Sequence, residues 1–128
     1  MRPCRILVAE DDAASREMLT AFLKLQGHIV LAAADGADAM AVASRFQPDV
    51  VITDICMPGL SGVDLCRQLH HDPKTRHVPV LAMTALSVDE REDVMEVGFE
   101  DVLAKPIEFD QLEQRVAAAC DPLYKRPH

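Results

Sequence analysis

Residues 50–58, Val-Val-Ile-Thr-Asp-Ile-Cys-Met-Pro, contain an apolar run that ends on a carboxylate, Asp54, directly before a turn signal. Three other apolar runs also end on reactive polar side chains, at Glu10 and Asp11, at Thr84, and at Lys105. Nearly continuous aliphatic runs are typical of parallel strands that are covered on both faces. Because open α/β sheets place ligands at the carboxyl ends of their strands, these four polar groups are predicted to meet at one edge.

Strand and helix signals alternate along the chain. Strand-like runs begin near residues 5, 29, 50, 78 and 102, which leaves room for a helix and two loops between neighbours. Helix starts are indicated where a capping residue stands three positions before an acid, as at Asp35, Ser61 and Ser87. The predicted fold class is α/β. Residues 1–121 should form a doubly wound, five-stranded parallel sheet with five helices, and residues 122–128 a tail or linker stub.

Composition excludes several classes of protein. The 128 residues are 49% hydrophobic and 27% charged, and the apolar runs are shorter than the ~20 residues that span a bilayer. No signal peptide is visible, so a soluble, cytoplasmic protein without membrane contacts is predicted. The formal net charge of −8 argues against a general nucleic-acid-binding surface, which would normally be basic.

The cysteines and the clustered histidines are not predicted to be functional groups. The four cysteines, at positions 4, 56, 66 and 120, have no C-x-x-C spacing and are expected to be reduced, partly buried thiols. His70, His71 and His77 flank a Pro-Lys segment, so solvated loop histidines are expected rather than a metal cluster.

Asp54 is the predicted reacting group of the chain. It ends a buried strand at a sharp turn, and Ser61 is already available to cap the next helix. Capping is therefore a weak explanation for Asp54. A carboxylate in such a position can act as a nucleophile toward phosphorus and form an acyl phosphate.

The other strand ends complete a phosphoryl and metal site. Glu10 and Asp11 would lie beside Asp54, and three clustered carboxylates repel one another unless a cation is present. Mg²⁺ prefers oxygen ligands and would offset that repulsion. The adjacent Asp12 is expected to cap the first helix rather than to bind the ion. Lys105 is predicted to neutralise the charge of the phosphoryl oxygens, and the Thr84 hydroxyl to donate a hydrogen bond to one of these oxygens.

Together these motifs resemble the receiver domain of bacterial two-component response regulators, from Arg5 to about Cys120. The segments that carry the resemblance are residues 6–12, ILVAEDD; 49–62, DVVITDICMPGLSG; 79–85, PVLAMTA; and 105–106, KP. The resemblance implies a flavodoxin-like sheet in the strand order 2-1-3-4-5 and a cis bond between Lys105 and Pro106.

The resemblance also implies a role for each site residue. Asp54 would be the phosphoacceptor, and Thr84 and Lys105 would contact the phosphoryl group. Mg²⁺ would be held by the acidic pair Glu10 and Asp11, by Asp54 and by the backbone carbonyl of Cys56. Mn²⁺ can substitute for it. The implied partner is a histidine kinase or a histidine phosphotransfer domain, while the downstream output is not indicated.

Two positions depart from the family pattern. Val102 stands in the fifth strand, where the family often has an aromatic residue that turns inward on phosphorylation. The structural response to phosphorylation is therefore expected to come mainly from Thr84 and the loop that follows it. Cys56 occupies a variable position, where only its carbonyl should bind metal and its thiol could be oxidised.

Three functions are compatible with the sequence. The favoured one is a phosphorylation-controlled signalling receiver that assists its own phosphorylation and dephosphorylation but is not an enzyme with a separate substrate. A phosphatase with an aspartyl nucleophile usually has a second Asp two residues later, where this chain has Cys56. A non-phosphorylated interaction module would be favoured by loss of an acidic residue or the lysine, and none is lost.

Overall fold

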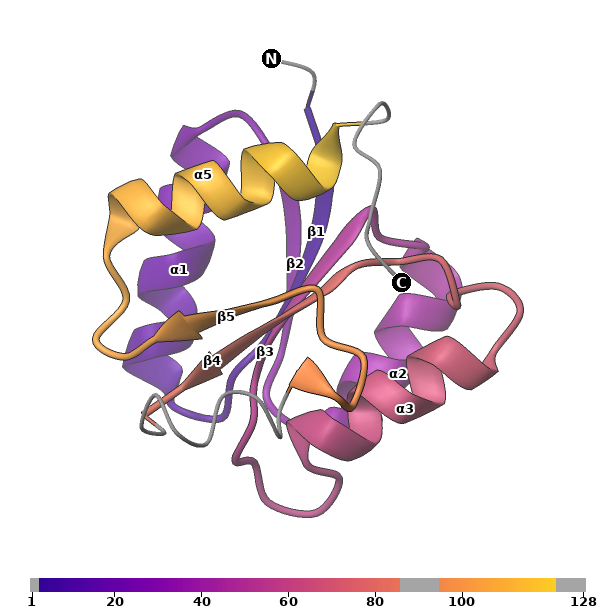
Figure 1. Ribbon diagram of the computed structural model, residues 1–128. Helices are drawn as coiled ribbons and strands as arrows, with labels where there is room; N and C mark the ends of the chain where they lie inside the picture. The colour runs from indigo at the N-terminus through magenta and orange to yellow at the C-terminus, as the bar shows by residue number, and fades with distance from the viewer. Residues whose placement is uncertain (1–2, 86–94, 122–128) are drawn as a thin grey trace.

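The strand order and helix placement follow the sequence prediction. The computed structural model describes residues 3–85 and 95–121 (Figure 1). The strands are β1 (Arg5–Ala9), β2 (Ile29–Ala33), β3 (Val50–Asp54), β4 (Val80–Thr84) and β5 (Asp101–Ala104). The helices within the described ranges are α1 (Ala13–Leu25), α2 (Gly36–Phe46), α3 (Gly62–His71) and α5 (Phe109–Cys120). The helix predicted to begin at Ser87 lies outside the described residues.

All five strands are parallel and pair in the order β2-β1-β3-β4-β5. This is the doubly wound, flavodoxin-like topology that the sequence predicted. The strand order reverses between β1 and β3, and open α/β sheets bind their ligands at the carboxyl ends of the strands at such a switch point. Asp54 is the last residue of β3, and Glu10 directly follows β1, so both lie at this switch point.

Two apolar cores cover the two faces of the sheet. Because side chains alternate along a strand, Leu7 and Ala9 belong to the core beneath α2 and α3, whereas Ile6 and Val8 belong to the core beneath α1 and α5. Figure 1 shows these two helix pairs on opposite sides of the strands. Every residue of β3 and β4 is buried, so the strands that carry Asp54 and Thr84 are held rigidly.

The helix starts confirm the capping predictions within the described residues. Asp12, Asp35 and Ser61 each accept a hydrogen bond from the backbone N–H three positions later, at 2.9, 2.8 and 3.2 Å. Such bonds satisfy N–H groups that a helix leaves unpaired in its first turn. The helices therefore begin at defined points just past the carboxyl ends of the strands.

The cysteine prediction was wrong for two of the four residues. Cys4 and Cys120 form a disulfide with a Cα–Cα distance of 6.0 Å, across 116 positions of sequence. The prediction failed because the spacing of cysteines along a chain says nothing about residues that the fold brings together. Cys56 and Cys66 are free thiols, as expected, and Cys56 is exposed while Cys66 is buried.

The histidine prediction holds in part. His77 is exposed in a turn, but His70 and His71 form the last residues of α3 rather than part of a loop. His70 is partly buried, with Nδ1 3.8 Å from Sγ of Cys66. Among the described residues, the histidines take no part in any cluster suited to bind a metal ion. None of the helices in this part of the chain is long and apolar enough to cross a membrane.

Candidate functional site

Polar side chains from four strand ends meet at the carboxyl edge of the sheet. Asp54 and Thr84 are the last residues of β3 and β4, while Glu10 and Lys105 directly follow β1 and β5. Glu10 and Asp54 are only 1% and 7% exposed, which is unusual for carboxylates, and Thr84 is 3% exposed. The structure thus places at one edge of the sheet the residues that the strand pattern predicted to converge there.

Lys105 joins the two buried carboxylates. Its Nζ lies 2.5 Å from Oδ2 of Asp54 and 3.3 Å from Oε1 of Glu10. Burial alone lowers the pKa of an ammonium group, but the hydrogen bond and charge of Asp54, followed by those of Glu10, outweigh it and raise the pKa of Lys105. Lys105 is therefore a permanent positive charge at neutral pH, and a third of its side chain remains exposed (33%).

Glu10 is the most deeply buried acid of the site. Burial raises the pKa of its carboxyl above the ordinary value of 4.5, and the nearby charge of Asp54 adds to this effect. The Asp12 backbone N–H, which donates to Oε2 at 3.2 Å, and Lys105 act in the opposite direction. A divalent cation placed among these carboxylates would favour their charged forms, because opposite charge lowers a carboxyl pKa.

The Asp54 carboxylate is oriented at both oxygens. The backbone N–H of Cys56 donates to Oδ1 at 3.2 Å, while Lys105 contacts Oδ2. The backbone around it is tightly packed against the start of α3. A Cβ at Gly62 would lie 2.2 Å from the carbonyl oxygen of Asp54, so only glycine fits this approach without movement.

Glu10, Asp11 and Asp54 could hold a metal ion. One carboxylate oxygen from each lies within 4.8 Å of the other two, and Asp11 is exposed whereas its two neighbours are buried. These are hard oxygen ligands, the type that Mg²⁺ and Mn²⁺ prefer. No sulfur or imidazole contributes to this cluster, so the donor set fits a magnesium-type ion better than zinc.

Two residues that position the site were not singled out by sequence reasoning. Arg16 on α1 donates from Nη1 to the carbonyl oxygens of Glu10, at 2.9 Å, and Asp11, at 3.4 Å, and so holds the loop after β1. No local signal distinguishes Arg16 from other surface arginines. Gly62 had a signal that could have been used, because it stands between the Ser61 cap and the body of α3, close to Asp54 in sequence.

The loop after β5 is tied to the end of β4. The Lys105–Pro106 bond is cis, as predicted, and the Lys105 backbone N–H donates to the carbonyl of Thr84 at 2.9 Å. The two strand ends that carry the lysine and the threonine are therefore connected directly.

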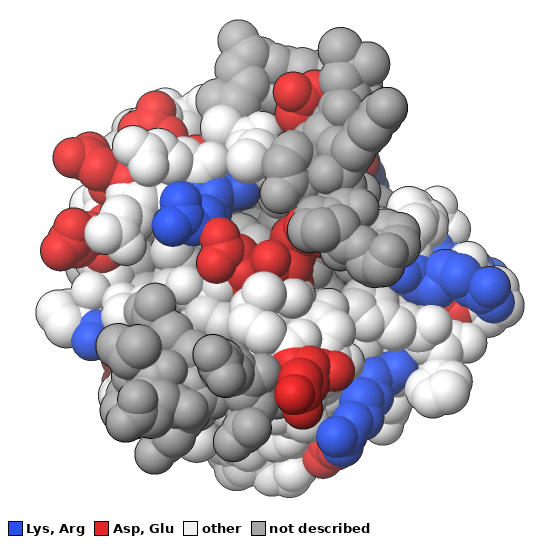
Figure 2. Space-filling view, in the orientation of Figure 1, with Lys and Arg blue, Asp and Glu red and all other residues white. Residues whose placement is uncertain are grey.

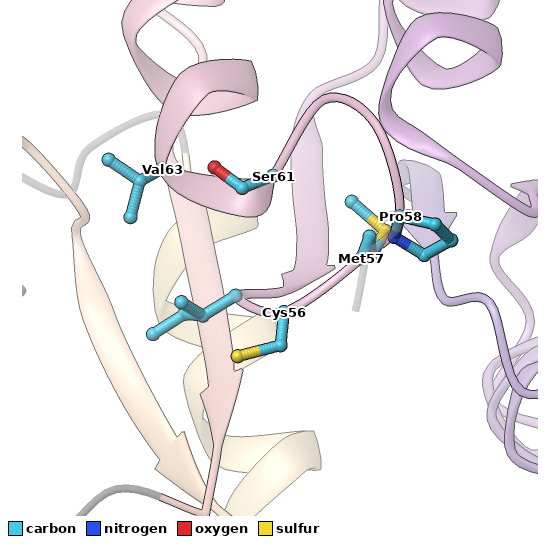
Figure 3. Close-up of a pocket in the computed structure, with 6 residues that line it drawn as sticks. Cys56, Met57, Pro58, Ser61 and Val63 are labelled. Atoms are coloured by element: carbon cyan, nitrogen blue, oxygen red, sulfur yellow. The ribbon is translucent and has the colours of Figure 1, made fainter.

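A pocket of about 540 Å³ lies along the loop that follows Asp54. Its walls are the loop after β3 and the first turn of α3, with the lining residues Ile55, Cys56, Met57, Pro58, Ser61 and Val63. Figure 3 shows the Cys56 thiol on this loop and Ser61 at the start of the helix. The exposed thiol is thus within two residues of Asp54, although only the Cys56 backbone contacts the carboxylate.

The face of the molecule drawn in Figure 2 carries both kinds of charge. On the face drawn in Figure 2, acidic and basic side chains of the described residues are interspersed, and no broad basic area gathers there. The formal net charge of −8 is consistent with this view. A phosphate backbone would find little electrostatic attraction on this face.

Comparison with known proteins identifies the family. Residues 6–117 match the response regulator receiver domain, so the chain belongs to this family. It is 42% identical over 113 residues to the response regulator PleD of Caulobacter vibrioides, covering 88% of this chain and 25% of that protein. The chain spans about a quarter to a half of the length of the curated relatives that it matches first.

Solved structures agree with this assignment. A putative response regulator from Chloroflexus aurantiacus J-10-fl superposes with a TM-score of 0.87 at 32% identity, covering 93% of this chain and 98% of that one. The receiver domain of the sensor histidine kinase PA1611 from Pseudomonas aeruginosa PAO1 gives a TM-score of 0.85 at 29% identity, covering 93% and 98%. That crystal structure has a magnesium ion coordinated in its active site cleft.

Proposed function

We propose that this chain is the phosphoacceptor of a two-component or phosphorelay system, with Asp54 as the residue that receives the phosphoryl group. The observation that carries the proposal is the bridge from Lys105 to both Asp54 and Glu10 at the carboxyl edge of the sheet. A buried carboxylate held between a backbone N–H and an ammonium group is oriented for attack on phosphorus, and the ammonium can neutralise the incoming oxygens.

The proposed reaction is a transfer from a phosphohistidine. One carboxylate oxygen of Asp54 attacks phosphorus, the P–N bond to the partner's imidazole breaks, and the imidazole leaves with the bonding electron pair and takes up a proton. The product is an aspartyl phosphate, a covalent acyl phosphate. Lys105 then neutralises one phosphoryl oxygen and Thr84 donates its hydroxyl to another, which together provide the positioning and charge neutralisation that phosphoryl transfer requires.

The transfer is proposed to depend on Mg²⁺, with Mn²⁺ as a substitute. Glu10, Asp11, Asp54 and the Cys56 carbonyl would hold the ion, directly or through water. When bound, the ion supplies positive charge that offsets the repulsion between the carboxylates and the phosphoryl oxygens. The oxygen-rich cluster of Glu10, Asp11 and Asp54 supports this assignment.

The proposed partner is a histidine kinase or a histidine phosphotransfer domain, encountered in the cytoplasm. Residues 1–121 would be the receiver domain, and residues 122–128 a tail or linker. We also propose that Val102, which is buried in β5 at 7% exposure, does not switch conformation as an aromatic side chain would. The response would then arise from Thr84 and the loop after it.

Chemical phosphorylation tests this function. Incubation with acetyl phosphate and Mg²⁺ should add one phosphoryl group, measured by intact mass, and Asp54→Asn should abolish the addition. Asp110→Asn is a matched control, because it removes the same charge from an exposed position on α5. Unchanged labelling of the Asp54→Asn protein would refute the assignment of the acceptor.

The metal requirement is tested separately. Asp11→Ala should prevent phosphorylation while leaving the fold intact, because Asp11 is exposed and removing it takes little apolar packing away. Excess chelator should have the same effect on the unmodified chain. Full labelling in chelator, with labelling still confined to Asp54, would show that the acidic pair does not bind an essential cation.

A further inference from the structure

The Cys4–Cys120 disulfide joins two segments that end the described fold. Cys4 directly precedes β1, and Cys120 is the last residue of α5, so the bond closes a loop of 116 positions. Figure 1 shows the end of α5 beside the start of β1. Cys4 is 1% exposed, whereas Cys120 is only partly buried and so is the more accessible member of the pair.

The two ends of this bond are held by different kinds of contact, backbone hydrogen bonds at Cys4 and small apolar side chains at the end of α5. On the strand side, the Cys4 N–H donates to Nδ1 of buried His28 at 3.1 Å, and the Cys4 carbonyl accepts from the N–H of Ile29 at 3.0 Å. These hydrogen bonds tie Cys4 to the start of β2 independently of its sulfur. Breaking the disulfide should therefore leave the beginning of β1 in place.

The helix side is weak near the disulfide. The residues just before Cys120 are three alanines, 117–119, of which only Ala119 is buried, so the last turn packs small side chains, Ala119 and partly buried Cys120, against the core. The last turn has no basic residue, and the C-cap is the acidic Asp121, whose negative charge is unfavourable at the negative end of the helix dipole. Without the sulfur bond, this end of α5 would be anchored through small apolar side chains, so we expect it to fray more readily.

The first two turns of α5, residues 109–116, are attached by other means. Phe109 stacks on Phe22 of α1 with ring centroids 4.3 Å apart, and Leu112 and Val116 are buried in the core beneath the helix. The ion pair between Arg115 and Asp101 of β5, at 2.6 Å, is partly exposed and adds a further tether. These contacts should survive loss of the disulfide.

We propose that Cys4 and Cys120 form a reversible thiol–disulfide switch that determines whether the C-terminal end of α5 is fixed to the start of β1. Stable disulfides are rare in reducing compartments, where paired cysteines usually sense or transmit redox state. The switch does not depend on phosphorylation of Asp54. The redox state of the two sulfurs would then decide whether the last turn of α5, which leads into residues 122–128, is fixed to the sheet.

The chemistry is exchange with a dithiol, either a small molecule or a dithiol oxidoreductase. A thiolate of the reductant attacks Sγ of Cys120, the S–S bond breaks, and Cys4 leaves as a thiolate that takes up a proton. The second thiol of the reductant then displaces Cys120 and closes the reductant's own disulfide. Two protein thiols are formed, and the two electrons come from the reductant.

The other cysteines provide internal controls. Cys66 is buried, and burial raises the pKa of its thiol to about 12, so it has almost no thiolate at neutral pH. Cys56 is exposed but lies on the loop after β3, at the carboxyl edge of the sheet, whereas Cys4 precedes β1 at the opposite edge. Neither is expected to replace a member of the pair.

The test compares the air-oxidised protein with the same protein in excess dithiothreitol. Peptide mapping should recover a Cys4–Cys120 cross-link that dithiothreitol removes and reoxidation restores. Amide exchange should then accelerate throughout, because global unfolding becomes easier, but by a larger factor at 117–121 than at 109–113 and 5–9. The melting temperature should fall by roughly 10 °C or more, because a cross-link of this length strongly restricts the unfolded chain.

Two variants make the outcome specific. The Cys4→Ser/Cys120→Ser protein should exchange as the reduced protein does and should not respond to dithiothreitol, whereas Cys56→Ser should respond as the unmodified chain does. Absence of the cross-link in oxidised protein would overturn the proposal. An acceleration at 117–121 no greater than that at 109–113 and 5–9 would also overturn it, and this comparison requires no variant to fold.

Discussion

Replacing Gly62 by alanine tests how tightly the fold constrains the acceptor Asp54. The new Cβ would lie 2.2 Å from the Asp54 carbonyl oxygen and 2.8 Å from Cα of Ile55, while real Cβ contacts essentially never fall below 3.0 Å. Both obstacles are backbone atoms, so no side chain can rotate away. The end of β3 or the start of α3 must move by most of an ångström.

The expected cost can be worked from this overlap. Forcing an extra methyl group into a packed region typically costs about 1–3 kcal/mol, and the better helix propensity of alanine returns at most about 1 kcal/mol. A net loss of about 1–2 kcal/mol should lower the melting temperature by roughly 3–10 °C for a domain of this size. Because a misplacement of about 1 Å can cost about 100-fold in rate, phosphorylation by acetyl phosphate should slow by about 10- to 100-fold.

The assay is thermal unfolding by circular dichroism together with the rate of labelling measured by mass. Gly27→Ala is the matched control, because a Cβ there meets nothing within 4 Å but the backbone has φ +93°. That variant should lose about 1 kcal/mol through backbone strain, with its labelling rate unchanged. If Gly62→Ala kept both its melting temperature and its labelling rate, the close approach would not be a real constraint.

Three further predictions address other parts of the molecule. Burial lowers the pKa of His28 from its ordinary value of 6.5, so the stability that neutral His28 contributes should be present above pH 6.5 and be lost as the pH falls through the lower pKa of the folded protein. His28→Asn, which keeps a hydrogen-bond acceptor, should therefore reduce the dependence of the melting temperature on pH between pH 7 and 5. An unchanged slope of melting temperature against pH would contradict this. Iodoacetamide should modify exposed Cys56 in the native protein but buried Cys66 only after unfolding, as read from peptide masses; equal rates would mean that α3 opens readily. Beryllofluoride with Mg²⁺ should slow amide exchange at Thr84 and change it little at Val102, whereas a largest change at Val102 would show that coupling needs no aromatic side chain.

Much of the fold could be predicted from local patterns. Continuous apolar runs such as Val50–Thr53 indicated parallel strands, and capping residues such as Asp35 and Ser61 marked the helix starts correctly. Parallel strands share one carboxyl edge, so the pattern also predicted that polar residues at four strand ends would converge. That inference required no knowledge of distances, because the topology of a parallel sheet enforces it.

The contacts within the site needed the tertiary structure. The sequence indicated that Lys105 would lie near acids, but not that one ammonium group would contact both Asp54 and Glu10. It gave no sign that Arg16 would hold the loop after β1, or that Gly62 would pack against the carbonyl of the acceptor. Each of these depends on how closely two elements approach, a distance that no periodicity along the chain encodes.

The cysteines show most clearly what could not be predicted from the sequence. Nothing in the spacing of Cys4 and Cys120 distinguishes them from Cys56 and Cys66, and all four were expected to be reduced thiols. The pairing is decided by α5 packing across the sheet so that its last residue reaches the start of β1, 116 positions away in sequence. Local sequence determines which elements form and where they begin and end, because those choices depend on near neighbours. Contacts between distant side chains are decided only when the elements pack, because packing sets the separations on which a covalent bond, an ion pair or a steric clash depends.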